Sequence, residues 1–178
     1  MMNAKALEIA SAIAMLLDSK DELTASRTHA NDVAKMARDT DPKAKVSSGS
    51  YRTAVVFDKF VVKFAQDDRQ EELRDEAEFI NKMRENETWG RHFPETHVLN
   101  IGGITVLIQE KVDMNHRSRR HMQDAAENLA YKLGLEDMHE GNYGWKGPKG
   151  KEYPVFIDVD FRWNAELPKP RVRRSWEV

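Results

Sequence analysis

Apolar residues near the N-terminus recur at the spacing that is typical of helices. They predict a first helix near Leu7–Leu17 and a second helix over Asn31–Arg38, which Asn31 or Asp32 would cap. Thr40-Asp41-Pro42 would end the second helix, because proline disfavours the helical conformation in the residue before it.

The pattern then changes to the short β-branched and aromatic runs that are typical of strands. Runs at Val46–Ser48, Thr53–Phe57 and Phe60–Ala65 predict three strands, and the two residues between the last two runs predict a tight hairpin. Alternation along the third run places Lys63 in mid-strand among small apolar neighbours. A lysine in that position is unusual without a partner, so it is a candidate functional residue.

The remainder of the chain mixes helices and strands, and the predicted fold class is α+β. One predicted helix is polar but carries Glu76 on the same stripe as its apolar residues, whereas Glu71, Glu72 and Glu78 are expected to face solvent. That polar helix is predicted at Arg69–Arg84, and a further helix at Arg119–Leu133. The further predicted strands are His97–Ile101, Ile104–Gln109 and Tyr153–Ile157.

The composition narrows the classes of function. The sequence has 178 residues, with 28 Lys plus Arg, 30 Asp plus Glu and no Cys. The absence of cysteine excludes a disulfide scaffold, a thiol nucleophile and a Cys-ligated metal site. The formal net charge of −2 argues against a strongly basic nucleic-acid-binding coat. No apolar run approaches the ~20 residues that a membrane-spanning helix needs.

The apolar stretch Ala6–Leu17 has some features of a signal peptide. However, Glu8 interrupts it, and charged residues at 18–22 follow it in place of a cleavage site with small residues. An amphipathic helix is the better interpretation, and we expect the protein to be cytoplasmic.

Several residues along the chain are of the types that phosphoryl transfer from a nucleotide requires. This reaction needs charge neutralisation and in-line positioning of the phosphates more than covalent work by the protein. A lysine held by a glutamate presents a fixed cation to the phosphates. Asparagine and aspartate oxygens can hold Mg²⁺, and a further aspartate can accept a proton from the attacking hydroxyl. In chain order, the candidates are Gly49, Lys63, Glu76, Asp137, Asn142 and Asp158.

Four segments resemble motifs of protein-kinase-like phosphotransferases. Asp137-Met138-His139-Glu140-Gly141-Asn142 looks like the D-x-H-x-G-N catalytic loop, in the variant shared by aminoglycoside-kinase-type enzymes and some phage kinases. Phe156–Asp160 resembles the metal-binding strand end, Phe60–Phe64 the strand with the phosphate-contacting lysine, and Gly49–Ala54 the glycine loop. The resemblance covers about Lys45 to Phe161, and its style is closest to short phage-encoded Ser/Thr kinases directed at host proteins.

The resemblance implies the roles of the reacting and metal-binding groups. Asp137 would be the catalytic base, and Asn142 and Asp158 would hold Mg²⁺. Lys63 would contact the α- and β-phosphates of ATP, with Glu76 as its ion-pair partner; Glu72 and Glu78 compete for that partnership.

The resemblance also implies how the nucleotide is enclosed. The segment of Gly49, Ser50, Tyr51 and Arg52 would cover the phosphates. A hinge at Glu110–Asp113 would present backbone groups of Glu110 and Val112 to adenine, and His139 would orient the catalytic loop.

The implied architecture is a reduced two-lobed kinase-like fold. It would comprise an N-terminal helical extension at 1–44, an N-lobe with an antiparallel sheet and a helix at 45–110, and a reduced C-lobe at 111–178. Val159 and Asp160 stand where protein kinases carry the phenylalanine and glycine of D-F-G, and the glycine loop has one glycine.

The function expected from these residues is Mg-ATP-dependent phosphorylation of Ser or Thr in host or self proteins, with a homodimer possible. Two other functions stay open. The short segment after Asp158 is compatible with a pseudokinase that binds and inhibits a protein, and the histidine of the catalytic loop is compatible with an aminoglycoside-type small-molecule kinase. Asp158 and Asp160 could alternatively form half of a two-metal nuclease site.

Overall fold

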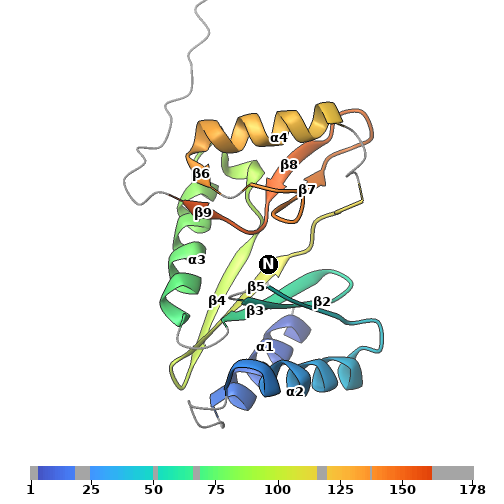
Figure 1. Cartoon of the computed structure of the whole chain (residues 1–178), viewed down its shortest axis with the longest axis vertical. Coiled ribbons are helices and arrows are strands. Elements are labelled where there is room, and N and C mark those ends of the chain that lie inside the picture. Colours follow the sequence, from blue (N-terminus) through green and yellow to red (C-terminus); the bar gives the residue numbers. More distant parts are fainter. Residues whose placement is uncertain are drawn as a thin grey trace, which may run out of the picture. The chain divides into compact units, whose positions relative to one another are not determined.

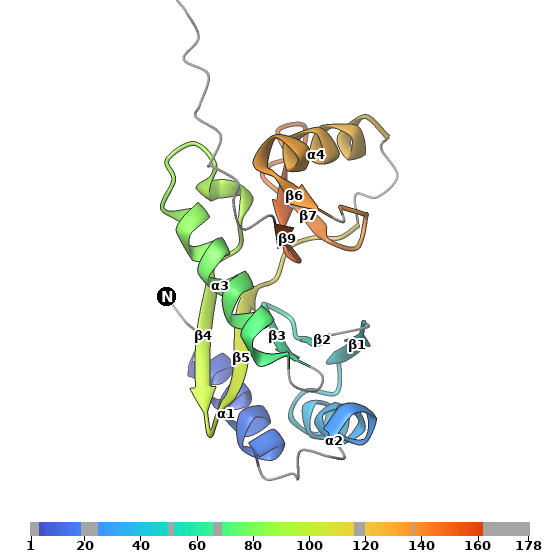
Figure 2. The same cartoon turned by 60° about the vertical axis from the view of Figure 1, so that its left-hand side comes forward.

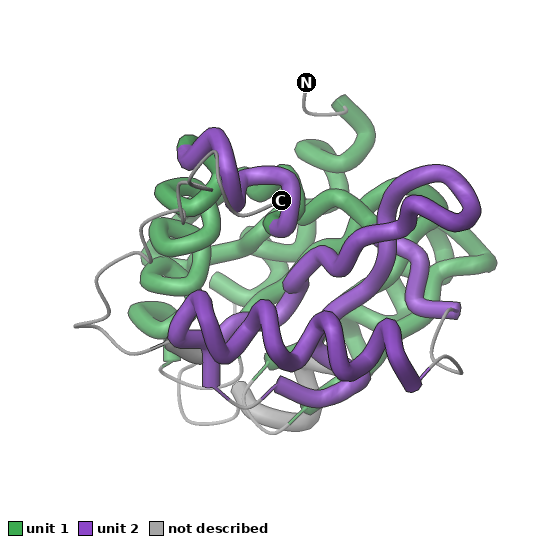
Figure 3. The backbone as a smooth tube through the Cα atoms, turned by 90° about the horizontal axis from the view of Figure 1, so that it is seen from above, with its two compact units in different colours: residues 1–85, 93–111 green, residues 86–92, 112–178 purple. Residues whose placement is uncertain are grey.

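The computed structural model describes residues 4–18, 25–49, 52–65, 69–115, 120–136 and 138–161 (Figure 1). The chain is an α+β protein, as its sequence predicts. It divides into two compact units, residues 1–85 with 93–111 (unit 1) and residues 86–92 with 112–178 (unit 2), which Figure 3 shows in different colours.

Unit 1 is built on a five-stranded antiparallel sheet with the strand order β1-β2-β3-β5-β4. Gly102 and Gly103 join the last two strands with φ values of 57° and 91°, a conformation that glycine adopts without steric cost. The predicted two-residue turn between β2 and β3 is closed by a hydrogen bond of 2.9 Å from Phe57 N–H to the Phe60 carbonyl. The strands are β1 (Lys45–Ser48), β2 (Arg52–Val56), β3 (Phe60–Ala65), β4 (Thr96–Ile101) and β5 (Ile104–Glu110).

Two N-terminal helices, α1 (Ala4–Asp18) and α2 (Ala25–Thr40), pack against one face of this sheet (Figures 1 and 2). They bury the side chains of Phe60, Val62 and Phe64 in the main hydrophobic core of the unit. The alternation of β3 therefore directs Lys63 to the opposite face, as the sequence predicts.

The start of α2 differs from the sequence prediction. The helix begins at Ala25, so Asn31 and Asp32 lie inside it and do not cap it. Burial of Val33 and Ala37 against the core outweighs the weak helix propensity of asparagine and aspartate. The helix ends at Thr40, before Pro42, where the sequence predicts its end.

Helix α3 (Gln70–Arg84) packs against β3, β4 and β5. Leu73 and Ala77 of this helix form a second, smaller cluster with Ala65 and Leu107 on the sheet. The buried stripe of α3 matches the predicted one and includes a carboxylate; it consists of Leu73, Glu76, Ala77, Ile80 and Met83.

Unit 2 combines one helix with two short two-stranded sheets. Strands β7 and β8 form an antiparallel hairpin whose inner face stacks Tyr143 edge-to-face with Trp145 and Phe156. Strands β6 and β9 were not predicted, because two residues each are too few to show a period. The elements are η2 (Gly90–His92), α4 (Arg120–Leu133), β6 (Leu135–Glu136), β7 (Tyr143–Lys146), β8 (Tyr153–Phe156) and β9 (Asp160–Phe161).

A buried histidine ties η2 to the β7–β8 hairpin. Arg91 Nε–H donates to His92 Nε2 at 3.2 Å, so the ring proton lies on Nδ1, which donates to the Pro154 carbonyl at 2.8 Å. Burial of the ring lowers the pKa of His92 below its usual value, and the nearby Arg91 cation acts in the same direction. Neutral His92 is therefore part of the folded state of unit 2.

Within the described part of the chain, none of the helices has the length and apolar character needed to cross a bilayer.

We expect the free energy of unfolding to depend on pH through His92. An unfolded histidine has a pKa near 6.5, whereas the pKa of folded His92 is lower. The stabilisation from neutral His92 is therefore fully present above about pH 6.5. It is lost as the pH falls through the pKa of the folded ring. Each unit of difference between the two pKa values is worth about 1.4 kcal/mol. Denaturant melts across this range should show a steeper acid loss for wild type than for His92→Gln, which can keep both hydrogen bonds. Parallel pH profiles would contradict a neutral His92.

Candidate functional site

Unit 1 holds a buried ion-pair cluster around one carboxylate. Lys63 Nζ donates to Glu76 Oε1 at 3.0 Å, and Arg52 Nη1 lies 2.5 Å from Glu76 Oε2. The side chain of Glu76 is 1% exposed and that of Lys63 is 7% exposed, whereas Arg52 keeps 23% of its side-chain surface in contact with solvent. The ion pair that the sequence predicts between Lys63 and Glu76 is thus present, and Glu72 is solvent-exposed.

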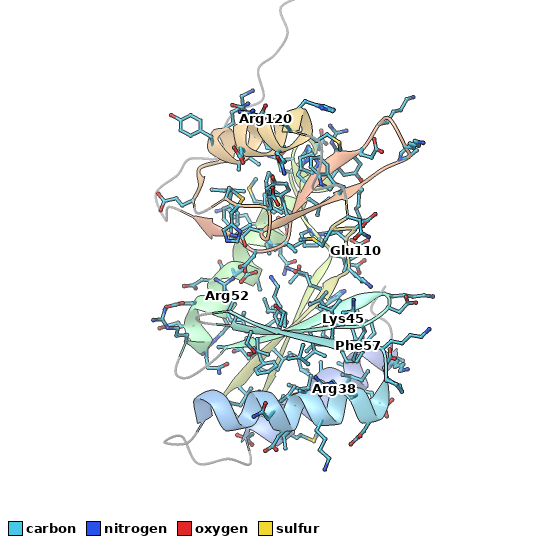
Figure 4. The ribbon with its side chains drawn as sticks, turned by 45° about the vertical axis from the view of Figure 1, so that its right-hand side comes forward. Arg38, Lys45, Arg52, Phe57, Glu110 and Arg120 are labelled. Carbon is cyan, nitrogen blue, oxygen red and sulfur yellow. The ribbon has the colours of Figure 1, made fainter. Side chains whose placement is uncertain are left out.

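The register of the sheet explains why these three groups meet. Ala54 of β2 lies opposite Lys63 of β3, and Arg52 lies two residues before Ala54 on the same strand. Residues two apart share a face, so Arg52 and Lys63 both lie on the face that α3 covers. Figure 4 shows Arg52 beside α3, at the end of β2. The small side chain of Ala54 leaves room for both longer ones.

Burial makes this cluster rigid. A charge withdrawn from water is stable only when it is paired and hydrogen-bonded, and here each oxygen of the carboxylate has a cationic neighbour. The ammonium group of Lys63 is consequently fixed in position by a helix that packs on the same face of the sheet. Such a fixed cation can contact an anionic group of a ligand without losing much side-chain entropy.

The turn between β1 and β2 lies next to this cluster in sequence. Gly49 N–H donates to the Arg52 carbonyl at 2.8 Å, and the hydroxyls of Ser48 and Thr53 are 3.2 Å apart, so the ends of the turn are joined. Ser50 and Tyr51, which the sequence assigns to phosphate binding, lie outside the described residues.

The predicted hinge follows β5. The amide N–H of Glu110 donates to the Glu95 carbonyl at 2.8 Å, so any contact of Glu110 with adenine would use its carbonyl oxygen. Val112 is buried, and the next residue, Asp113, accepts a 2.8 Å hydrogen bond from Trp145 N–H. The segment therefore joins the end of β5 in unit 1 to the β7–β8 hairpin of unit 2.

Residues 139–142 of the D-x-H-x-G-N segment form a tight turn before β7. Gly141 N–H donates to His139 Nδ1 at 3.1 Å, and Asn142 N–H donates to the His139 carbonyl at 2.8 Å. A Cβ at position 141 would lie 2.8 Å from His139 Cε1, so the ring would have to shift for any larger residue. The ring of His139 is thus hydrogen-bonded within the turn. Asp137 lies outside the described residues.

A backbone contact joins the two segments that carry the predicted metal ligands. The Asn142 carbonyl accepts hydrogen bonds from Ile157 N–H at 2.9 Å and from Asp158 N–H at 3.3 Å. The side chains of Asn142 and Asp158 are both half-buried. Adjacent backbones thus carry an amide oxygen and a carboxylate, which are hard donors.

This donor pair fits Mg²⁺ by its chemistry. Magnesium prefers oxygen ligands, keeps several waters and often uses only one or two protein side chains together with substrate phosphates. Among the residues that the structure describes, no group of three or more His, Cys, Asp or Glu side chains is arranged to hold a metal ion.

The contact between Arg52 and Glu76 was not predicted, because the resemblance places Arg52 in the segment that covers the phosphates. The signal that could have found it is the hairpin register. With a two-residue turn at 58–59, Ala54 must oppose Lys63, and Arg52 then lies on the lysine's face.

We expect Glu76→Leu to destabilise the protein by about 3–5 kcal/mol, because it leaves the buried Lys63 cation without this carboxylate. Glu72→Leu is the matched control on the same helix, and its 52% exposed side chain should change stability by about 0.5 kcal/mol or less. Adding Lys63→Met to Glu76→Leu should recover part of the loss. Denaturant unfolding is measured for wild type, the control, the single variants Glu76→Leu and Lys63→Met, and the double variant. A double variant whose loss equals the sum of the two single losses would argue against the coupling.

We expect His139→Ala to loosen the turn at 139–142, since Gly141 N–H loses its acceptor. A hydrogen bond worth about 1 kcal/mol corresponds to roughly fivefold faster amide exchange at Gly141. His121→Ala, at an exposed position of α4, is the control and should leave this amide unchanged. Equal exchange in all three proteins would show that the ring does not hold the loop.

No family model, no curated protein and no solved structure matches this chain. Its function must be inferred from the contacts of its own residues.

Proposed function

We propose that this protein is a Mg-ATP-dependent phosphotransferase that phosphorylates Ser or Thr hydroxyls of proteins. The observation that carries the proposal is the buried ion pair of 3.0 Å between Lys63 on β3 and Glu76 on α3. A lysine buried in mid-strand and held by a helix carboxylate has the form needed to present a fixed positive charge to phosphates. The D-x-H-x-G-N turn and Asp158 are the further parts that this chemistry requires.

In unit 1, Lys63 would contact the α- and β-phosphates, and Glu76 would hold its ammonium group in place. Arg52 would fix the second carboxylate oxygen of Glu76, which limits rotation of the carboxylate about its bond to the side chain. Gly49 to Arg52 would cover the phosphates, and the backbone of Glu110 and Val112 would contact adenine.

In unit 2, Asn142 and Asp158 would hold Mg²⁺, which supplies neutralisation of phosphate charge when it is bound. Asp137 would accept the proton of the substrate hydroxyl as that oxygen attacks the γ-phosphorus, and the bond from the γ-phosphorus to the β–γ bridging oxygen would break. His139 would hold the turn between Asp137 and Asn142 by accepting a hydrogen bond from Gly141 N–H.

The test is transfer of radiolabel from γ-labelled ATP to the protein itself and to lysate proteins. Lys63→Met and Asp137→Ala should each lower the rate by about 10²-fold or more, since each removes a group that acts on the reacting phosphates or hydroxyl. The matched control is Lys59→Met, at an exposed lysine in the turn before β3, and it should label like wild type.

Binding should be measured beside turnover. Wild type is expected to gain thermal stability from ATP only when Mg²⁺ is present, and Asp158→Asn should weaken that gain. Equal labelling by wild type and Asp137→Ala would refute the proposed base. A nucleotide-dependent gain without any labelling would indicate a pseudokinase, and labelling of aminoglycosides but not proteins would indicate a small-molecule kinase.

A further inference from the structure

The turn between β7 and β8 concentrates positive charge in unit 2. It contains Lys146, Lys149 and Lys151 within the sequence Lys-Gly-Pro-Lys-Gly-Lys, and the side chains of Lys149 and Lys151 are exposed. We name these three lysines, together with Arg91, the basic turn. The chain as a whole has a net charge of −2, so this concentration is local.

Arg91 contacts Tyr153, which forms the last residue pair of the hairpin with Lys146. Lys146 lies opposite Tyr153 in the register of β7 and β8. The guanidinium carbon of Arg91 is 5.2 Å from the centre of the Tyr153 ring, a distance typical of cation–π contact. The carboxylate within the turn, Glu152, accepts a 2.6 Å hydrogen bond from Gly150 N–H.

The backbone of the turn is well defined. Lys151 N–H donates to the Pro148 carbonyl at 2.9 Å, and a Cβ at Gly147 would lie 2.7 Å from the Lys151 carbonyl, so the turn is closed on itself. Gly147 and Gly150 have φ values of 105° and 85°, which glycine adopts readily. A partner would therefore meet lysines on an ordered backbone and would not have to order a loop.

The same hairpin begins at the D-x-H-x-G-N turn. Asn142 immediately precedes β7, and Lys146 is the last residue of that strand. Four residues at the rise of a strand span about 13 Å, and an extended peptide covers that length with about four residues. Strand β7 is itself buried between β8 and the segment at Asp113, so a peptide would pass outside it. A peptide that runs parallel to β7 with its hydroxyl near Asn142 would bring residues about four positions away to the basic turn.

We propose that the basic turn binds acidic side chains of the protein substrate, located about four residues from the phosphorylated Ser or Thr. The inference deepens the proposed kinase function and rests on it for the position of the hydroxyl. Carboxylates pair with exposed lysines, and such pairs steer association and select partners more than they add raw affinity.

An acidic peptide fits better than a nucleic acid. Nucleic-acid binding uses a stripe of cations that follows many phosphates, whereas the cations here are gathered at one end of a four-residue strand. The separation of about 13 Å between Asn142 and Lys146 also matches about four residues of an extended peptide whose hydroxyl lies near Asn142.

The experiment measures peptide binding by fluorescence anisotropy without nucleotide, and phosphoryl transfer to the same peptides separately. The probe is a fluorescent serine peptide with a short glutamate cluster about four positions from the serine, compared with a scrambled peptide of equal composition. Wild type should bind and phosphorylate the first peptide preferentially, and the preference should disappear at high salt. Lys149→Gln/Lys151→Gln should weaken binding roughly three- to tenfold.

The control is Arg120→Gln/Lys132→Gln, which removes the same charge from exposed positions of α4 and should bind like wild type. Equal binding of the two peptides, equal binding by the turn variant, or tighter binding of a single-stranded RNA would each overturn the proposal. Phosphoryl transfer without preference for the acidic peptide would overturn it and leave the kinase function standing. If the acidic peptide binds wild type more tightly than the Lys149→Gln/Lys151→Gln variant but no peptide is phosphorylated, the binding site is supported and the proposed kinase function is refuted.

Discussion

The carboxylate of Glu76 imposes the strongest constraint on unit 1. Glu76 belongs to α3 and lies on the side of that helix that faces the sheet, where it is almost completely withdrawn from water. It is stable there because Lys63 and Arg52 both form ion pairs with it. This requirement fixes the rotation of α3, the face of β3 that carries a lysine, and the register between β2 and β3. A shift of β2 by one residue would turn Arg52 toward the hydrophobic core instead.

Unit 2 is organised by backbone rather than by charge. The Asn142 carbonyl, with two N–H groups directed at it, joins the D-x-H-x-G-N turn to the end of β8, while His139 shapes the turn from within. The two units thus solve different problems. Unit 1 stabilises a cation at a buried position, and unit 2 places the backbones of Asn142 and Asp158 side by side. The proposed phosphoryl transfer would draw on residues of each unit.

Local patterns were sufficient to predict most elements of unit 1, whereas the pairing of Lys63 with Glu76 was implied by the resemblance to kinase-like phosphotransferases. The alternation of β3 and the apolar stripe of α3 each involve only neighbouring residues. What local patterns missed depends on distant contacts. Strands β6 and β9 have two residues each and pair across the whole length of the hairpin, and the start of α2 is set by packing on the core. The contact of Arg52 with Glu76 depends on combining the register of the β2–β3 hairpin with the position of α3.

The path of the chain has a consequence for how the protein can be divided. Residues 86–92 belong to unit 2, yet they are inserted between α3 and β4 of unit 1. Neither unit is therefore one continuous stretch of sequence, and a cut after Lys111 would leave His92 without Pro154, its hydrogen-bond acceptor. During synthesis, the sheet of unit 1 can be completed once Lys111 has emerged, but the inserted segment must wait for β8. A chimaera that fuses residues 1–111 to another protein would therefore contain residues 86–92, which belong to unit 2.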